Sequence, residues 1–451
     1  MTSSRFDDVS VERLRRRRTV KWSLYGPDVL AAWVAEMDFD VAKAVKAALL
    51  DAVEREDFGY VEADTSELTD AAAAFFTATY GWEVSPRRVF LVADVLAGIA
   101  GALGAFVPAG APVVLPTPAY PPLFDVIELS GRPVVPVAMI GGDGGGMAVA
   151  PAGPGDPASP GSPRRSSETA AEAGTTAGAS PAAGPPPTSG TALRAAVLDL
   201  ERIDAALAAG ARAVLLTNPH NPTGRVFTAG ELQGLAAVVD RHGGRVIADE
   251  VHGPLTSPGH PFVPYASVSD AAAEHAVTVI SASKAWNLAG LKCAQVVATN
   301  HDDADQWRRL PLFAVPGPSP LGIAASVAAY RDGLDARGWL ADLVAYLDGN
   351  RRRLVELVGA ELPGVRLHPP EGTFLAWLDC AALGLEDPAR FFLDEARVAL
   401  SDGPPYGGGL DVSGPGGGAS SYAQHVRLNF ATSAALLDRI VGSMGEALRR
   451  R

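Results

Sequence analysis

Short apolar runs of strand length alternate with helical patterns along the first two thirds of the chain. Runs such as 87–94, 211–217 and 276–280 have no polar alternation, which is typical of strands buried on both faces. Apolar residues at helical spacing lie between them, for example at 95–107 and 229–243. Strands that alternate with helices predict crossover connections. We therefore expect an α/β fold whose sheet is mostly parallel and lies between helices.

The expected elements of this first region can be given as ranges. Helices are expected at 40–56, 67–82, 95–107, 203–210 and 229–243. Strands are expected at 87–94, at 111–123 before a proline-rich loop, and at 132–140, 211–224, 245–253 and 276–283, most of them running into loops.

The last third of the chain has a different pattern. Longer helices are predicted around 320–359, and strands at 365–380 and 425–433, which together are typical of a smaller α+β domain. The predicted division is a large domain over 46–315 and a small domain formed by 1–45 and 316–451.

Two glycine-rich segments interrupt these patterns. Residues 141–194 contain 12 Gly and 9 Pro and no aromatic residue, so they cannot bury enough apolar surface to offset the entropy of ordering. This segment is predicted to be a disordered surface insertion within the large domain, because the strand–helix alternation resumes after it. Residues 403–418 interrupt the small domain in a similar way. Neither segment is expected to carry chemistry.

Composition and charge exclude several classes of protein. The chain has 451 residues, 47% of them hydrophobic, and a net charge of −13, which argues against nucleic acid and an anionic membrane surface as partners. The basic run at 13–18 is better explained as a solvated helix face. Its two cysteines, Cys293 and Cys380, give no disulfide framework and favour a reducing cytoplasm. No signal peptide or membrane-spanning apolar run is expected.

Three polar residues each follow a predicted strand. They are Asn221 in NPHNPTG, Asp249 in IADEVH and Lys284 in SASK. Ligands of open parallel sheets bind beyond the carboxyl ends of the strands, so these side chains are expected to face one crevice. Pyridoxal phosphate requires this set: a lysine that attaches it, a carboxylate that keeps the ring nitrogen protonated, and an amide for the phenolic oxygen.

The neighbours of Lys284 fit the same cofactor. Ser281 and Ser283 could donate hydrogen bonds to its phosphate, and Lys292 could supply positive charge. Each residue alone has a plainer explanation, since a strand-end lysine can lie at the surface and Asp249 can cap a helix. The three motifs together make coincidence the weaker explanation.

These motifs, in this order, resemble those of the class I/II aminotransferase superfamily of fold-type I pyridoxal-phosphate enzymes. The resemblance covers nearly all of the chain outside the two glycine-rich segments. Residues 20–39, VKWSLYGPDVLAAWVAEMDF, and 58–64, FGYVEAD, further resemble the MalY/PatB-type branch of cystathionine β-lyases, or cysteine-S-conjugate β-lyases. This implies a large domain with a seven-stranded type of sheet and a smaller α+β domain.

The resemblance also implies roles for residues around the cofactor. Tyr120 would stack on its ring, and the amides of Val95 and Leu96 would bind its phosphate at a helix N-terminus, although ADVLAG lacks the glycine-containing turn frequent in the family. Tyr60 would reach the phosphate of a neighbouring subunit, which implies a homodimer with a shared active site. From the residues alone, Tyr120 could be an ordinary loop aromatic and Tyr60 a core residue.

The resemblance further implies that Arg427, together with Tyr60, binds the substrate and that His252 is a candidate cofactor-binding residue. Arg427 in HVRLNFA matches the arginine that binds the α-carboxylate, for which a guanidinium is better suited than an amine. Taken alone it could be a surface strand residue. His252 stands where many aminotransferases have a tyrosine, and its role is left open between structure and catalysis.

The reaction implied is α,β-elimination from cystathionine or a related cysteine S-conjugate, giving a thiol, pyruvate and ammonia. Lys284 would act as the general base. The alternative is transamination, which uses the same residues; only the N-terminal motifs favour elimination. A non-catalytic regulator is disfavoured because no part of the chain is left over for a DNA-binding helix-turn-helix. The sequence does not indicate which conjugate is preferred.

Overall fold

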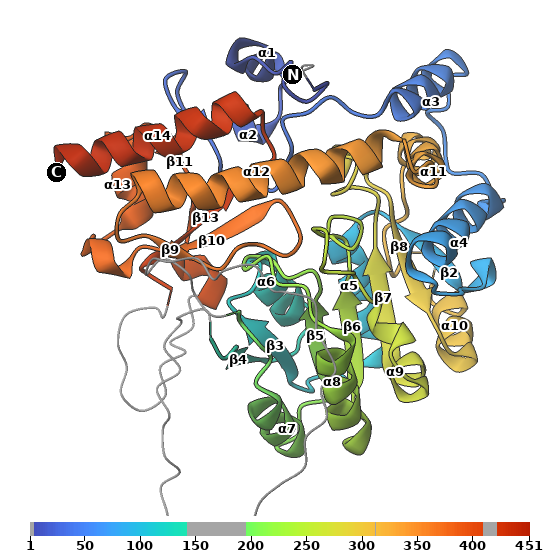
Figure 1. Cartoon of the computed structure of the whole chain (residues 1–451). Coiled ribbons are helices and arrows are strands. Elements are labelled where there is room, and N and C mark those ends of the chain that lie inside the picture. Colours follow the sequence, from blue (N-terminus) through green and yellow to red (C-terminus); the bar gives the residue numbers. More distant parts are fainter. Residues whose placement is uncertain (1–3, 142–194, 312, 409–421) are drawn as a thin grey trace, which may run out of the picture.

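The computed structural model describes residues 4–141, 195–311, 313–408 and 422–451. A seven-stranded sheet flanked by helices forms one part of the molecule, and a smaller sheet beneath two long helices forms the other (Figure 1). The predicted insertion at 141–194 lies outside the described residues except for its first position. The predicted domain division at 45/46 and 315/316 stays a prediction.

The large sheet has the strand order β2-β8-β7-β6-β5-β3-β4. All neighbouring pairs are parallel except those of β8, which runs antiparallel to both β7 and β2. The expectation of a mostly parallel sheet is therefore confirmed. The strands are β2 (Val89–Val92), β3 (Val113–Thr117), β4 (Val134–Ala138), β5 (Ala213–Thr217), β6 (Arg245–Asp249), β7 (Ala276–Ile280) and β8 (Ala294–Ala298).

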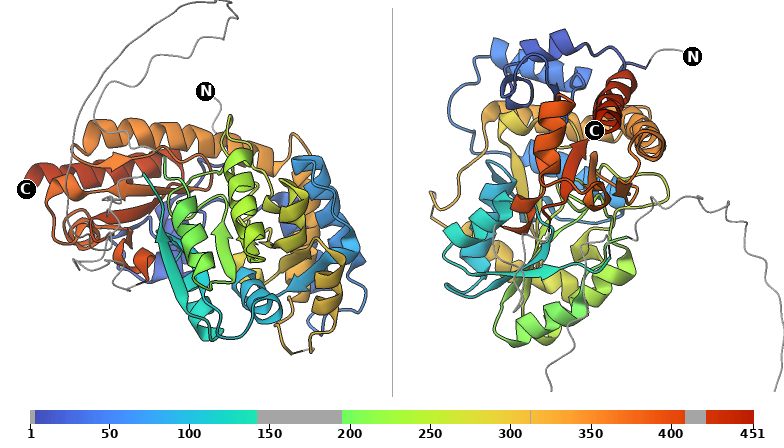
Figure 2. Two further views of the ribbon diagram at one scale, coloured as in Figure 1. Left: turned by 90° about the horizontal axis from the view of Figure 1, so that it is seen from below. Right: turned by 90° about the vertical axis from the view of Figure 1, so that its left-hand side faces the viewer.

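Both faces of this sheet are covered, and β5 illustrates how. Ala213 and Leu215 belong to one apolar cluster, whereas Val214 and Leu216 belong to another, because successive side chains of a strand point to opposite faces. Figure 2 shows the cyan helices α5 and α6 and the green helices α7 and α8 on opposite sides of the sheet. Burial on both faces explains why these strands are uninterrupted apolar runs.

The helices of this part carry their apolar side chains towards the sheet or towards each other. They are α3 (Lys43–Glu54), α4 (Ser66–Tyr80), α5 (Val95–Phe106), α6 (Pro122–Leu129), α7 (Leu200–Ala208), α8 (Ala229–Arg241), α9 (Asp270–His275) and α10 (His301–Arg308), with 3₁₀ turns η1 (Pro86–Arg88), η2 (Tyr265–Ser267) and η3 (Ala289–Leu291).

The smaller sheet is antiparallel, with the strand order β12-β13-β10-β9, and β1 pairs with β11 beside it. In α14, Leu437, Ile440, Val441 and Met444 are buried at helical spacing and form its inner face. Helices α12 and α14 lie side by side at the top of Figure 1. The elements are β1 (Leu30–Ala31), β9 (Arg366–Leu367), β10 (Leu375–Asp379), β11 (Val398–Ala399), β12 (Ser401–Asp402), β13 (His425–Asn429), α1 (Val11–Arg16), α2 (Val20–Ser23), α11 (Pro320–Gly333), α12 (Trp339–Glu361), α13 (Pro388–Glu395), α14 (Ala434–Arg450), η4 (Ala381–Leu383) and η5 (Pro404–Gly407).

The sequence patterns missed several elements. Helix α6 follows the prolines of a predicted loop, because proline is compatible with the first turn of a helix. Strand β8 was missed because Gln295 interrupts its apolar run. The Gln295 side chain is buried and accepts a hydrogen bond from the Tyr330 hydroxyl at 2.5 Å. The basic run at 13–18 does lie largely on a helix, α1, with most of its arginines at the surface.

Candidate active site

The carboxyl ends of β5, β6 and β7 meet at one cavity. Its volume is about 170 Å³, and its lining includes Asn221, Asp249 and Lys284. Asp249 is the last residue of β6, and the other two stand in the loops that follow β5 and β7. The structure therefore brings together the three residues that sequence reasoning placed at one crevice.

The surroundings of the Lys284 amine favour its neutral form. Its Nζ donates a 2.9 Å hydrogen bond to the carbonyl oxygen of Ala35, which comes from the N-terminal segment. Burial and the positive charge of Arg427 together lower the pKa of Lys284 to about 8, while Asp249 and Glu36 oppose the shift. This amine loses its proton far more readily than a surface lysine.

Asp249 is buried, and its Oδ1 accepts a hydrogen bond from the amide of Val251 at 3.2 Å. Burial raises the pKa of this carboxyl to about 6, and the amide of Val251 and the charge of Lys284 limit the rise. At neutral pH the carboxylate is therefore mostly ionised and faces the same cavity as the amine.

Asn221 is linked to Arg427 of β13. Its Oδ1 accepts a 2.9 Å hydrogen bond from Arg427 Nη1, and Arg427 Nη2 donates to the carbonyl of Trp33 and to the hydroxyl of Ser401. Arg427 is buried, and its Nε has no hydrogen-bond partner among the described residues. The arginine is thus held in place while one of its donors stays free.

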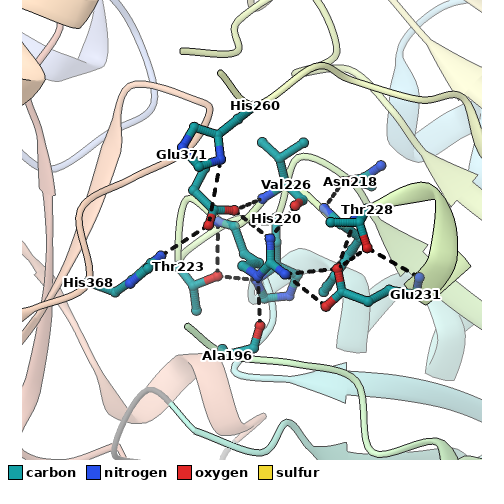
Figure 3. A network of polar contacts seen from close by, with 12 residues as sticks. Ala196, Asn218, His220, Thr223, Val226, Thr228, Glu231, His260, His368 and Glu371 are labelled. Carbon is teal, nitrogen blue, oxygen red and sulfur yellow. Dashed lines mark hydrogen bonds and ion pairs between the residues drawn. The ribbon is translucent and has the colours of Figure 1, made fainter. Parts of the chain in front are cut away.

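The loop that carries Asn221 is anchored to the smaller sheet through the polar network of Figure 3. The Glu371 carboxylate accepts hydrogen bonds from Arg225 Nη1 at 2.5 Å and from the amide of Val226 at 2.9 Å. Gly224 adopts φ +71°, and a Cβ there would come within 2.6 Å of the Pro370 Cβ. Only glycine permits this approach of the two loops without strain.

Further bonds keep this loop in shape. His220 Nδ1 and Thr223 Oγ1 are 2.9 Å apart, and Asn218 Oδ1 accepts from the amide of Phe227 at 3.1 Å. Arg225 also forms an ion pair with Glu231, whose carboxylate closes a capping box with Thr228 at the start of α8. These bonds hold the loop on both sides of Asn221, from Asn218 at its start to Arg225 before α8.

The N-terminus of α5 forms another side of the cavity, where Val95, Leu96 and Lys292 lie. Asp94 caps this helix by accepting from the amide of Ala97 at 2.9 Å, and Lys292 Nζ lies 2.7 Å from its other oxygen. Partial burial alone would raise the pKa of Asp94, but hydrogen bonds from Lys292 and the Ala97 amide lower it overall. An anion is thus already stabilised at this helix end.

The two serines expected at the phosphate also line the cavity. Ser281 Oγ donates to the carbonyl of Cys293 at 2.7 Å and accepts from the amide of Ser283 at 3.0 Å. The Ser281 hydroxyl therefore already has a backbone acceptor, and the role of both serines at a phosphate stays a prediction.

Three aromatic or imidazole side chains complete the list of sequence candidates. Tyr120 and His252 line the cavity; His252 is buried, its ring lies 5.7 Å from that of Phe374, and its Nδ1 has no partner among the described residues. Burial, followed by the charges of Lys284 and Arg427, lowers the pKa of His252 well below its usual value, so the ring is neutral. Tyr60 is fully exposed and does not line this cavity.

Some residues at the site were missed from the sequence. Asp94 was read only as the end of a strand, although an acid before an apolar helix is a cap signal. Tyr406 belongs to the glycine-rich patch at 403–418, which was not expected to contribute. Its ring lies 5.4 Å from the guanidinium of Arg427, so the described part of the patch contacts a candidate site residue. Whether the patch carries chemistry stays a prediction, and residues 409–421 lie outside the described residues.

A sequence profile of the aminotransferase class I and II family matches residues 33–145 and 194–444. The chain belongs to this family. It is 38% identical to a "Putative cystathionine beta-lyase" of Mycobacterium tuberculosis, with all of both chains covered, and 32% identical to the cystathionine beta-lyase of Corynebacterium glutamicum, covering 98% of this chain and 97% of the other. A solved structure from Corynebacterium diphtheriae, titled a "putative plp-dependent beta-cystathionase", is 34% identical with a TM-score of 0.80 and covers 98% of each chain.

The residues at the cavity of this family member fit pyridoxal phosphate. Lys284 and Asp249 share the cavity, and a cation and a helix N-terminus lie at another part of it. His252, which lines this cavity, has a buried Nδ1 for which the described residues provide no hydrogen-bond partner. Nothing in the described part of the cavity conflicts with this cofactor.

Proposed function

We propose that the chain is a pyridoxal-phosphate-dependent carbon–sulfur β-lyase that converts cystathionine or a related cysteine S-conjugate to a thiol, pyruvate and ammonia. The observation that carries the proposal is the pairing of Lys284 and Asp249 in one cavity, in a chain whose full-length relatives are named for this activity. The expectations of this cofactor and this class of enzyme are confirmed. The roles of individual residues remain part of the proposal.

When bound, pyridoxal phosphate accepts the electron pair left at Cα of an amino acid. Asp249 would pair with the ring nitrogen as a carboxylate, and it is ionised at a pH above its pKa of about 6. Asn221 orients Arg427 through their hydrogen bond, and Arg427 holds the substrate α-carboxylate by charge-assisted hydrogen bonding.

Lys284 would hold the cofactor covalently and would serve as the base at Cα of the substrate. Its amine is suited to this because burial lowers its pKa to about 8, so a substantial fraction is neutral near physiological pH. The carbonyl of Ala35, which accepts from Nζ, fixes the direction of the amine. With sulfur at Cβ, loss of the Cα proton is followed by departure of the thiolate.

The experiment that tests this function is pyruvate release from L-cystathionine by the cofactor-loaded protein with no keto acid added. We expect pyruvate to form over many turnovers. An aminotransferase would stop after one half-reaction, and activity that appears only with an added amino acceptor would overturn the lyase assignment.

We also propose a homodimer in which Tyr60 completes the neighbouring active site. Tyr60 and Phe58 are exposed aromatic side chains on the same loop, as expected of residues that a second subunit covers. The test mixes Lys284→Ala with Tyr60→Ala subunits after unfolding and refolding them together. Recovered activity supports a shared site, because only a mixed dimer contains one intact site; two inactive parents that stay inactive when mixed would contradict it.

A cytoplasmic location is proposed as well, because both cysteines, Cys293 and Cys380, are buried free thiols. No helix among the described residues is long and apolar enough to cross a bilayer. Fractionation of the producing cell tests the location directly.

A further inference from the structure

A second cavity adjoins the active site and opens towards solvent. Its volume is about 460 Å³, and it shares Tyr120 and Arg427 with the surroundings of Lys284. Tyr25, Trp33 and Tyr406 contribute aromatic walls. Because Arg427 lines this cavity and its charge also reaches Lys284, a substrate whose α-carboxylate is held by Arg427 can extend the group on its Cβ into this space.

The side of the cavity formed by α13 and β12 carries charge of both signs. Asp387, Arg390 and Asp402 all line it. Asp387 Oδ1 accepts from the backbone amide of Arg390 at 2.8 Å, which places the first two residues on one turn of α13. Partial burial and the negative charge of Asp387 raise the pKa of Asp402, while the amide of Gly403, which donates to Asp402 Oδ1 at 2.8 Å, limits the rise.

The guanidinium of Arg390 is only partly engaged. Its Nε donates to Asp394 Oδ2 at 2.5 Å, and its side chain is 68% exposed, so its remaining donors are accessible. A wall with two carboxylates and an accessible guanidinium matches a group that itself carries an ammonium and a carboxylate. Arg427, which also lines the cavity, has a buried Nε that is unpaired among the described residues.

We propose that this cavity binds the leaving-group half of the substrate and selects S-conjugates whose leaving group ends in an α-amino acid. Asp402, supported by Asp387, binds the distal ammonium, and Arg390 binds the distal carboxylate. This inference rests on the lyase function proposed above. It adds two specificity-determining residues that do not touch the reacting bond.

The test uses four cysteine S-conjugates with different leaving groups: L-cystathionine carries both charges, S-(2-aminoethyl)-L-cysteine only the ammonium, S-(carboxymethyl)-L-cysteine only the carboxylate, and S-ethyl-L-cysteine neither. Pyruvate release gives kcat/KM for the wild type, Asp402→Asn and Arg390→Gln. Glu395→Gln is the matched control, because Glu395 is an exposed acid of the same helix outside the cavity.

Asp402→Asn is expected to lower kcat/KM for cystathionine and the aminoethyl conjugate about tenfold, mainly through KM, and to leave the other two nearly unchanged. Arg390→Gln is expected to affect cystathionine and the carboxymethyl conjugate instead. Equal losses on all four substrates, or no loss on any, would overturn the specificity proposal while leaving the lyase function intact. No pyruvate from any substrate with the wild type would overturn the lyase function itself. Visible absorbance of the bound cofactor and thermal melting confirm that each variant is folded.

Discussion

Arg427 Nη1 and Asn221 Oδ1 are joined by a 2.9 Å hydrogen bond that links β13 of the smaller sheet to the loop after β5 of the larger one. Both side chains are buried, and the bond holds the guanidinium at the edge of the cavity. The arginine that is proposed to bind the substrate therefore depends on a residue proposed to bind the cofactor.

Replacing Arg427 by lysine should show how much this geometry matters. A lysine cannot hold Asn221, Trp33 and a substrate carboxylate together, because its ammonium lacks the planar fork of donors. We expect kcat/KM for L-cystathionine to fall at least tenfold, mostly through a higher KM. Arg353→Lys, at an exposed ion pair with Asp438, serves as the control and should change little. An unchanged KM for Arg427→Lys would remove this residue from the carboxylate site.

Removal of the Lys284 amine should abolish turnover and covalent cofactor attachment together. We expect Lys284→Ala to retain less than about a thousandth of wild-type activity, since the residue combines the nucleophile and the base. Borohydride reduction followed by mass spectrometry measures attachment. Lys292→Ala should keep the attachment and bind the cofactor less tightly. Normal turnover by Lys284→Ala would contradict the whole assignment.

Cofactor loading of the apoprotein should depend on pH through Lys284. Only the neutral amine attacks an aldehyde, so the loading rate should rise with pH and level off above the pKa of about 8. The apoprotein should also become more stable as the pH rises from about 8 towards 10.5, because the unfolded chain binds a proton on this lysine that the folded chain has lost. Stopped-flow absorbance measures the loading rate. A midpoint near 10 would mean that the amine is solvated.

The ion pair of Arg225 and Glu371 should contribute to the stability of the contact between the two parts of the molecule. Both side chains are about nine-tenths buried, so Glu371→Gln leaves a buried positive charge that, in the described part of the chain, is paired only with Glu231. We expect a loss of about 3 kcal/mol in the free energy of unfolding. Urea denaturation of Arg225→Met, Glu371→Gln and the double variant measures the coupling. Asp438→Asn, at the exposed pair with Arg353, should cost less than about 1 kcal/mol.

Deletion of residues 146–193, the span that separates the two matched parts of the family profile, tests the sequence-based expectation for the glycine-rich segment. We expect the shortened chain to bind the cofactor and release pyruvate at rates within about twofold of the full chain, since long surface insertions are tolerated. Circular dichroism establishes folding. A folded deletion variant that no longer binds the cofactor would show that this segment contributes to the site.

The part of the site that could be predicted from sequence is the part that lies at strand ends. Lys284, Asp249 and Asn221 follow neighbouring parallel strands, so their meeting point follows from the topology. Trp33, Ser401 and Tyr406 could not be predicted in this way, because they reach Arg427 through contacts between segments distant in the chain. Helix α6 was missed because its prolines resemble a loop, and β8 because a buried glutamine interrupts its apolar pattern.

The site forms late in protein synthesis, because its residues are far apart in the chain: Ala35 follows β1, Lys284 follows β7 and Arg427 lies in β13. A nascent chain translated only as far as η3 contains Lys284 and Asp249, but the segment with Arg427 has not yet been made. The lysine of such a chain lacks one of the charges that lower its pKa and much of the protein that excludes water. Its amine is expected to stay protonated, so the growing chain is protected from premature reaction with cellular aldehydes until folding has brought both parts together.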